Sequence, residues 1–177
     1  MLVKLNCFRE TFMSNLEMCE IQKKHYEVWI ELYHKYAEYY QVDIPKDNFD
    51  LTWKWLTSEN YPFWGILADL DSKIVGFAHF RSLPSPLDSC EVGFLDDLFV
   101  LQEYRGKKIG YSLIEKVHQI GKSKNWPYIN WITKDDNYTA RTCLLYTTDA
   151  ADDGLGVDLG GRRKIKKNEE GGGGGGG

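Results

Sequence analysis

The chain has 177 residues, of which 14% are aromatic and 27% are charged, and its formal net charge is −4. This length and aromatic content favour one folded domain with a substantial core over a disordered chain. The slight negative charge argues against nucleic-acid binding by bulk electrostatics, and no apolar run reaches the roughly 18–20 residues that a membrane-spanning helix needs. We therefore expect neither nucleic acid nor a membrane as a partner.

The cysteines and histidines do not indicate a metal site. The four cysteines, at positions 7, 19, 90 and 143, show no Cys-x-x-Cys spacing, and the four histidines, at positions 25, 34, 79 and 118, lack the spacing of metal ligands. Unpaired thiols are typical of a cytosolic protein, and the N-terminus has no secretory pattern of basic, apolar and small residues. We expect a cytoplasmic protein without a bound metal.

The first elements in chain order are predicted to be a strand and two helices. The strand is expected over residues 16–22. An amphipathic helix is expected over 24–40, because large apolar residues recur there at helical spacing. Pro45 ends any continuation of this helix, and Asp47 or Asn48 is expected to cap the second helix.

A hairpin and a further strand are predicted next. Residues 63–70 and 74–80 read as two strands, joined by a turn over 69–73. Pro84-Ser85-Pro86 indicates a loop, and residues 91–100 read as the following strand.

The strand ending at Val100 leads into a basic turn, Arg105-Gly106-Lys107-Lys108, and then into a helix over about 107–124. A glycine turn at the start of a helix directs several backbone N–H groups to one point, where the helix dipole adds partial positive charge. This combination binds phosphate, and the three basic side chains add full charges there. The sequence therefore predicts a phosphate-binding turn.

This stretch resembles motif A of the GNAT acyltransferases, whose pattern is Arg/Gln-x-x-Gly-x-Gly/Ala. It stands here as Arg105-Gly106-Lys107-Lys108-Ile109-Gly110, with Lys108 in place of the middle glycine. A strand over 128–133 and the stretch 133–141, with Asn137 and Ala140, resemble the second acyl-CoA motif of the same family. Together the resemblance covers roughly residues 15–141.

The resemblance implies an α/β fold, an α+β mixed sheet with helices on both faces, in which two neighbouring parallel strands splay apart to admit acetyl-CoA. The strand would offer backbone groups to the pantetheine, the turn would hold the pyrophosphate, and Asn137 would bond the pantetheine amides, an ordinary helix cap being its alternative role. The cofactor-binding residues predicted in this way are Leu98, Phe99, Val100, Arg105, Gly106, Lys107, Lys108, Ile109, Gly110, Tyr111 and Asn137.

The reaction implied is direct transfer of an acetyl group to an amine. It needs a donor to the thioester carbonyl, such as a strand N–H near 98–100, and a base for the proton of the ammonium. Asp96 and Asp97 are the candidate catalytic bases, and only one is expected to face the split, since successive strand residues point to opposite faces. In polyamine-acetylating relatives the first acidic position, here Asp96, is the base. Glu91 is a weaker candidate.

The domain is predicted to span 13–141 and to be incomplete, with residues 1–12 as an upstream extension before a start at Met13. From residue 142 the composition changes, and 142–177 resemble a translated sequencing adapter followed by a run of G bases. We expect a non-native tail, a C-terminally truncated fold and a general acid that is unassigned because its usual position falls in this segment. A natural basic, glycine-rich tail that binds nucleic acid is the alternative.

The function predicted is an N-acetyltransferase that moves an acetyl group from acetyl-CoA to a primary amine of a small cationic molecule. Tyr36, Tyr40, Asp43 and Asp47 are candidates for an anionic aromatic pocket that would bind such an amine. A non-catalytic acyl-CoA-binding module is the alternative function. Whether the chain forms a homodimer is open, and a nucleic-acid role for the basic turn is disfavoured because aromatic interleaving is absent.

Overall fold

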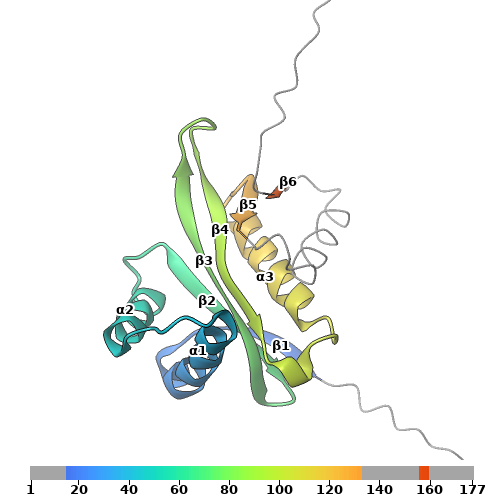
Figure 1. Ribbon diagram of the computed structural model, residues 1–177. Helices are drawn as coiled ribbons and strands as arrows, with labels where there is room; N and C mark the ends of the chain where they lie inside the picture. The colour runs from blue at the N-terminus through green and yellow to red at the C-terminus, as the bar shows by residue number, and fades with distance from the viewer. Residues whose placement is uncertain (1–14, 133–155, 160–177) are drawn as a thin grey trace, which may run out of the picture.

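A computed structural model describes residues 15–132 and 156–159, which form a single mixed sheet with helices on both faces (Figure 1). The sheet has six strands in the order β1-β2-β3-β4-β5-β6. Neighbours from β1 to β4 are antiparallel, whereas β4–β5 and β5–β6 are parallel. The strands are β1 (Leu16–Glu20), β2 (Phe63–Leu70), β3 (Lys73–Ser85), β4 (Cys90–Val100), β5 (Tyr128–Trp131) and β6 (Gly156–Leu159). The predicted mixed α/β fold is confirmed.

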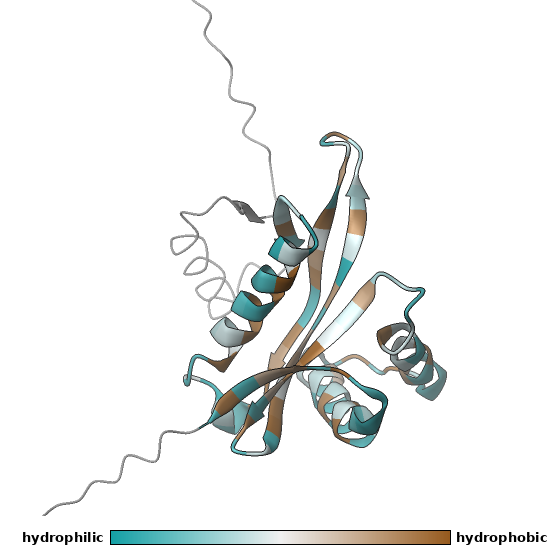
Figure 2. Ribbon diagram, turned by 180° about the vertical axis from the view of Figure 1, so that it is seen from behind, coloured by the Kyte–Doolittle hydropathy of each residue, from teal (hydrophilic) through white to brown (hydrophobic). Residues whose placement is uncertain are grey.

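The helices cover the two faces of this sheet unequally. Helices α1 and α2 lie on one face and α3 on the other (Figures 1 and 2). In Figure 2 the hydrophobic residues of α3 lie toward the sheet and its hydrophilic residues toward the outside. The helical elements are η1 (Lys23–His25), α1 (Tyr26–Tyr40), α2 (Lys46–Leu56), η2 (Gln102–Tyr104) and α3 (Ile109–Ser123). Among the residues described, no helix is both long and apolar enough to cross a membrane.

The hydrophobic core lies between the sheet and these helices. On the α1 face, the buried Trp29 and the half-buried Tyr33 pack on one another with ring centroids 5.1 Å apart, and Tyr33 meets Phe77 of β3 edge to face. On the α3 face, Leu113 and Val117 are almost completely buried. Burial of a large apolar side chain contributes about 1.5–3 kcal/mol, so these two layers stabilise β3 and β4 in the middle of the sheet.

Two local predictions were wrong. Strand β3 does not end at Phe80 but continues through Pro84 to Ser85, where a loop was predicted. Its pairing with β2 ends at Arg81, so the last residues of β3 form an edge, where a proline without an N–H is tolerated. Helix α2 begins at Lys46, and Pro45, rather than Asp47 or Asn48, occupies the position before its first turn.

Candidate active site

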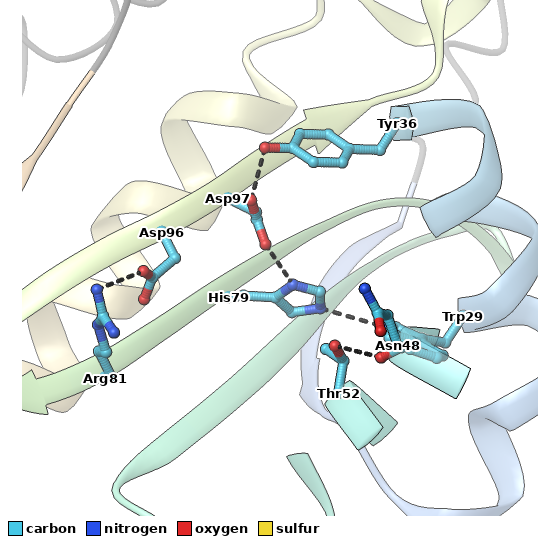
Figure 3. A network of polar contacts seen from close by, with 8 residues as sticks. All are labelled: Trp29, Tyr36, Asn48, Thr52, His79, Arg81, Asp96 and Asp97. Carbon is cyan, nitrogen blue, oxygen red and sulfur yellow. Dashed lines mark hydrogen bonds and ion pairs between the residues drawn. The ribbon is translucent and has the colours of Figure 1, made fainter. Parts of the chain in front are cut away.

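A β-bulge in β4 places two carboxylates side by side. Asp97 pairs with His79 and Leu95 pairs with Phe80, so Asp96 is an extra residue between two paired positions. Asp97 contacts His79 and Asp96 contacts Arg81, and these two partners are two residues apart on β3 and therefore share one face (Figure 3). The expectation that only one aspartate would face the site was wrong, because a bulge interrupts the alternation of side chains.

Asp97 is the end of a chain of hydrogen bonds that runs into the core. The indole Nε1 of Trp29 donates to Nε2 of His79 over 2.9 Å, and Nδ1 of His79 lies 2.9 Å from Oδ2 of Asp97. The hydroxyl of Tyr36 donates to the other oxygen, Oδ1, over 2.5 Å. Because an indole N–H only donates, Nε2 of His79 is the acceptor and Nδ1 carries the hydrogen that it donates to Asp97.

This arrangement keeps Asp97 ionised. Its burial raises the pKa, but the hydrogen bonds from His79 and Tyr36 and the attraction of Arg81 outweigh burial and hold the pKa of Asp97 below its usual value. His79 is completely buried, and the Asp97 side chain is 17% exposed. Both oxygens of Asp97 are already engaged by α1 and β3, which makes this carboxylate a poor proton acceptor for a ligand.

Asp96 has the opposite properties. Its Oδ1 lies 3.1 Å from the guanidinium of Arg81, while Oδ2 is buried and has no hydrogen-bond partner among the described residues. Burial raises its pKa to about 6; the nearby Arg81 opposes this shift and the charge of Asp97 adds to it. A partly exposed carboxylate with an uncommitted oxygen and a pKa close to neutrality has the properties of a general base.

Glu91, the weaker candidate base, lies on the other face of the sheet. Its Oε2 accepts a 2.7 Å hydrogen bond from Ser82, the residue next to Arg81 on β3. Because neighbouring strand residues point to opposite faces, Ser82 and Glu91 are separated by the sheet from Asp96.

The end of β4 has the open edge that an acyl-CoA site needs. Among the described residues, β5 pairs with β4 only from Gly93 to Leu95, so 96–100 extend beyond this pairing. The side chain of Phe99 is buried against Tyr36 and Phe77 on the α1 face, while Leu98 and Val100 are half-buried. Backbone groups of this segment, rather than the Phe99 ring, are therefore what β4 presents on its open side.

The basic turn brings backbone donors to the start of α3. Gly106 has φ +79°, and a Cβ added there would meet nothing within 4 Å. Lys108 also has a positive φ, 61°, and α3 begins directly after it, at Ile109, two residues later than predicted. Ile109 is buried in the core, whereas Gly110 and Tyr111 are half-buried in the first turn of the helix. The space beside Gly106 is thus open.

The basic side chains of this turn are partly committed to the protein. Nε of Arg105 donates to the carbonyl oxygen of Val100 over 2.9 Å, and its guanidinium lies 4.8 Å from the ring centroid of Tyr39. The ammonium of Lys107 lies 5.1 Å from the ring centroid of Tyr104. Arg105 therefore ties the turn to the end of β4. The last predicted cofactor-binding residue, Asn137, lies outside the described residues.

Replacing Lys108 with glycine is expected to raise the free energy of unfolding by about 0.5–1 kcal/mol, because only glycine adopts a positive φ without strain. Lys107→Gly is the matched control: its φ is not positive, so it should destabilise the protein. Urea denaturation of both variants measures the difference. Equal destabilisation by both substitutions would show that the left-handed conformation of Lys108 carries no strain.

Sequence reasoning missed three residues of the site, namely Trp29, His79 and Arg81. Trp29 lies in the amphipathic helix predicted over 24–40, where the large apolar residues were expected to be core, and His79 was considered only as a metal ligand. One signal for His79 was available in the sequence: a histidine within the apolar run 74–80. It pairs with an aspartate on the next strand, β4, and this pairing indicates a hydrogen-bonded polar pair in the core. Arg81 lay beyond the predicted end of its strand. The register of β3 against β4, including the bulge, was needed to bring these residues together.

Comparisons with known proteins agree with this geometry. The model of the Acetyltransferase (GNAT) family matches residues 29–146. A D-amino-acid N-acetyltransferase of Saccharomyces cerevisiae, HPA3, is 30% identical over 129 residues, which are 72% of this chain and 79% of that protein. An uncharacterised N-acetyltransferase of Archaeoglobus fulgidus is 31% identical over 116 residues, 64% of this chain and 76% of the relative.

Solved structures show the same fold. The aminoglycoside N-acetyltransferase AAC(6′)-Iy, solved with a bisubstrate analogue of CoA, superposes with a TM-score of 0.68 at 21% identity and covers 85% of this chain and 95% of that one. A probable acetyltransferase superposes with a TM-score of 0.67 at 21% identity, covering 74% and 87%. The chain belongs to the GNAT acetyltransferase family. It is accordingly an N-acetyltransferase, as predicted.

Proposed function

We propose that this N-acetyltransferase uses acetyl-CoA to acetylate the primary amine of a small molecule that is cationic at that amine, and that Asp96 is the general base. The main support for the proposal is that the bulge places Asp96 and Asp97 in two different environments. Asp97 is held ionised by two hydrogen bonds, whereas Asp96 has a raised pKa and an uncommitted oxygen. Two carboxylates with separated pKa values are a common sign of an acid–base site.

Acetyl-CoA supplies an acetyl group activated as a thioester. The residues present fit such a group in two places. The segment 96–100 of β4 lies beyond the pairing with β5 and has backbone groups to offer to an extended pantetheine. The turn at Gly106, open and followed by the N-terminus of α3, has backbone N–H groups to offer to a pyrophosphate.

The chain's own residues then act on the amine. Asp96 takes one proton from the ammonium, which leaves a nucleophilic lone pair on nitrogen. A backbone N–H near 98–100 stabilises negative charge that develops on the carbonyl oxygen, and one such donor is typically worth about 3–4 kcal/mol. One C–N bond replaces one C–S bond, and the products are an amide, the free thiol of CoA and one proton.

The names of the relatives support a small amine as the acceptor. HPA3 is described as acting on D-amino acids, and a structural neighbour as acting on aminoglycosides. The predicted anionic aromatic pocket has less support: Tyr36 is committed to Asp97, and Asp43 and Asp47 are exposed. We therefore base the choice of acceptor on Asp96 and its surroundings.

Release of CoA thiol that depends on an added amine tests the proposal. Purified protein is incubated with acetyl-CoA and with polyamines, amino acids, aminoglycosides or peptides, and the thiol is measured with a chromogenic disulfide. We expect amine-dependent release that Asp96→Asn reduces strongly and that Glu91→Gln, the matched change on the other face of β4, leaves intact. Binding of CoA without release for every acceptor would instead favour a non-catalytic acyl-CoA-binding module.

A further inference from the structure

Arg81 is a half-exposed cation beside Asp96 that the reaction itself does not use. It lies on β3 two residues after His79, and its side chain is 47% exposed, against 23% for Asp96. Its guanidinium carbon lies 5.2 Å from the ring centroid of Phe94, the residue opposite it on β4. The flat guanidinium is therefore held over a ring, with one nitrogen turned to Asp96 (Figure 3).

We propose that Arg81 binds a carboxylate of the acceptor, so that the preferred substrates are amino acids, in which the reacting amine and a carboxylate share one carbon atom. This inference rests on the proposed function, because it assigns the acceptor of the same site. Arg81 is then a specificity-determining residue, and Asp96 and Arg81 together recognise the two opposite charges of the substrate.

The geometry supplies both halves of such a receptor. Oδ2 of Asp96 is buried and has no hydrogen-bond partner among the described residues, and rotation of the partly exposed carboxylate would turn it toward an ammonium. A guanidinium carries five N–H donors in a fixed plane, so the single contact of Arg81 with Oδ1 of Asp96, at 3.1 Å, leaves it able to bind a second carboxylate. Because the two side chains touch, the charges they would bind must also be close together, as they are in an α-amino acid and are not in a diamine.

The balance of charges around the bulge also favours binding of a substrate carboxylate by Arg81. Asp96 and Asp97 bring two negative charges to the site. Asp97 accepts hydrogen bonds from the ring N–H of His79 and the hydroxyl of Tyr36, and the positive charge of Arg81 acts on both carboxylates. A substrate ammonium is attracted to this region, whereas a carboxylate is repelled from it unless it meets Arg81. Arg81 therefore also sets the orientation in which an amino acid enters.

Matched pairs of substrates test this inference. Phenylalanine, in both enantiomers, is compared with phenethylamine, and lysine with cadaverine; each pair differs only by the carboxylate. For the wild-type protein we expect kcat/KM to favour the amino acid by about 10- to 100-fold, the range for one charged hydrogen-bonded contact. In Arg81→Gln this preference should disappear, mainly through a higher KM, whereas Arg81→Lys should retain part of it.

The comparison within each pair removes the effect of Arg81 on the base, because both members of a pair use the same Asp96. Thermal melts of the variants check that the half-exposed Arg81 can be replaced without loss of the fold. Equal kcat/KM for the two members of each pair in the wild type, or an unchanged preference in Arg81→Gln, would overturn the inference and leave the proposed function intact. No thiol release with any amine would overturn both.

Discussion

Replacing Asp96 with asparagine is expected to lower kcat/KM for amine acetylation by about 10²- to 10⁴-fold, the usual contribution of a positioned general base. Asparagine has nearly the same shape and keeps an oxygen for Arg81, but it cannot accept the proton of an ammonium. Initial rates of thiol release at saturating acetyl-CoA measure the effect. A rate within about threefold of the wild type would exclude Asp96 as the base.

The same substitution is expected to stabilise the fold. The pKa of Asp96 is raised from 3.8 to about 6, so the ionised form is disfavoured in the folded state. When the pKa of a carboxyl group is higher in the folded state than in the unfolded state, the free energy of unfolding falls as pH rises from about 4 to about 6. The protein remains less stable by this amount at higher pH. Because the carboxylate is partly exposed, solvent screens the effect, and we expect Asp96→Asn to raise the free energy of unfolding at neutral pH by about 1 kcal/mol. A base that costs stability is consistent with a functional rather than a structural role.

Replacing Asp97 with alanine is expected to destabilise the fold, in contrast to Asp96→Asn. The expected loss is about 2–4 kcal/mol of unfolding free energy. The change leaves the buried N–H of His79 and the hydroxyl of Tyr36 without their acceptor, and an unsatisfied buried donor costs about 1–3 kcal/mol. Asp97→Asn is the matched control, since its amide oxygen keeps one of the two donors paired and should lose less. Urea denaturation gives both values. Equal losses for the two variants would show that hydrogen bonding at Asp97 is not the cause.

The pH dependence of stability separates the two aspartates further. The pKa of Asp97 is lowered in the folded state, so its contribution is fully present above the ordinary carboxyl value of 3.8 and is lost as pH falls through the folded-state value. Acidification should therefore destabilise the wild type below about pH 4 through Asp97, and this component should be missing in Asp97→Asn. Thermal melts as a function of pH measure it.

The fold could be predicted from sequence because its strongest signals are local. The apolar run that ends at Val100, the basic glycine turn and the periodic helix after it follow one another along the chain, and each is stabilised by its own residues. The hairpin of β2 and β3 was also predictable, from two apolar runs around a short turn. The end of β3 was not, because Pro84 is acceptable only where the neighbouring strand β2 has already stopped.

The candidate site was predicted in part. Asp96 and Asp97 were identified as a pair, but strict alternation along a strand predicts that they face opposite sides. The bulge that overrides this alternation appears only in the register between β3 and β4. His79 and Arg81, which give the two carboxylates different properties, reach them through this strand pairing. Trp29, which donates a hydrogen bond to His79, comes from helix α1 and is 50 residues away from it in sequence. Sequence periodicity carries no information on such contacts.

The pH dependence of kcat/KM tests the central claim most directly. We would measure amine acetylation by the wild type and by Asp96→Asn from about pH 5 to about pH 9, a range that spans the expected pKa of the base. If Asp96 is the base, kcat/KM of the wild type falls on the acidic side with a midpoint near its pKa of about 6, and this limb is absent from the residual activity of Asp96→Asn. A wild-type profile without a limb in this region, or a limb that persists in Asp96→Asn, would contradict the account.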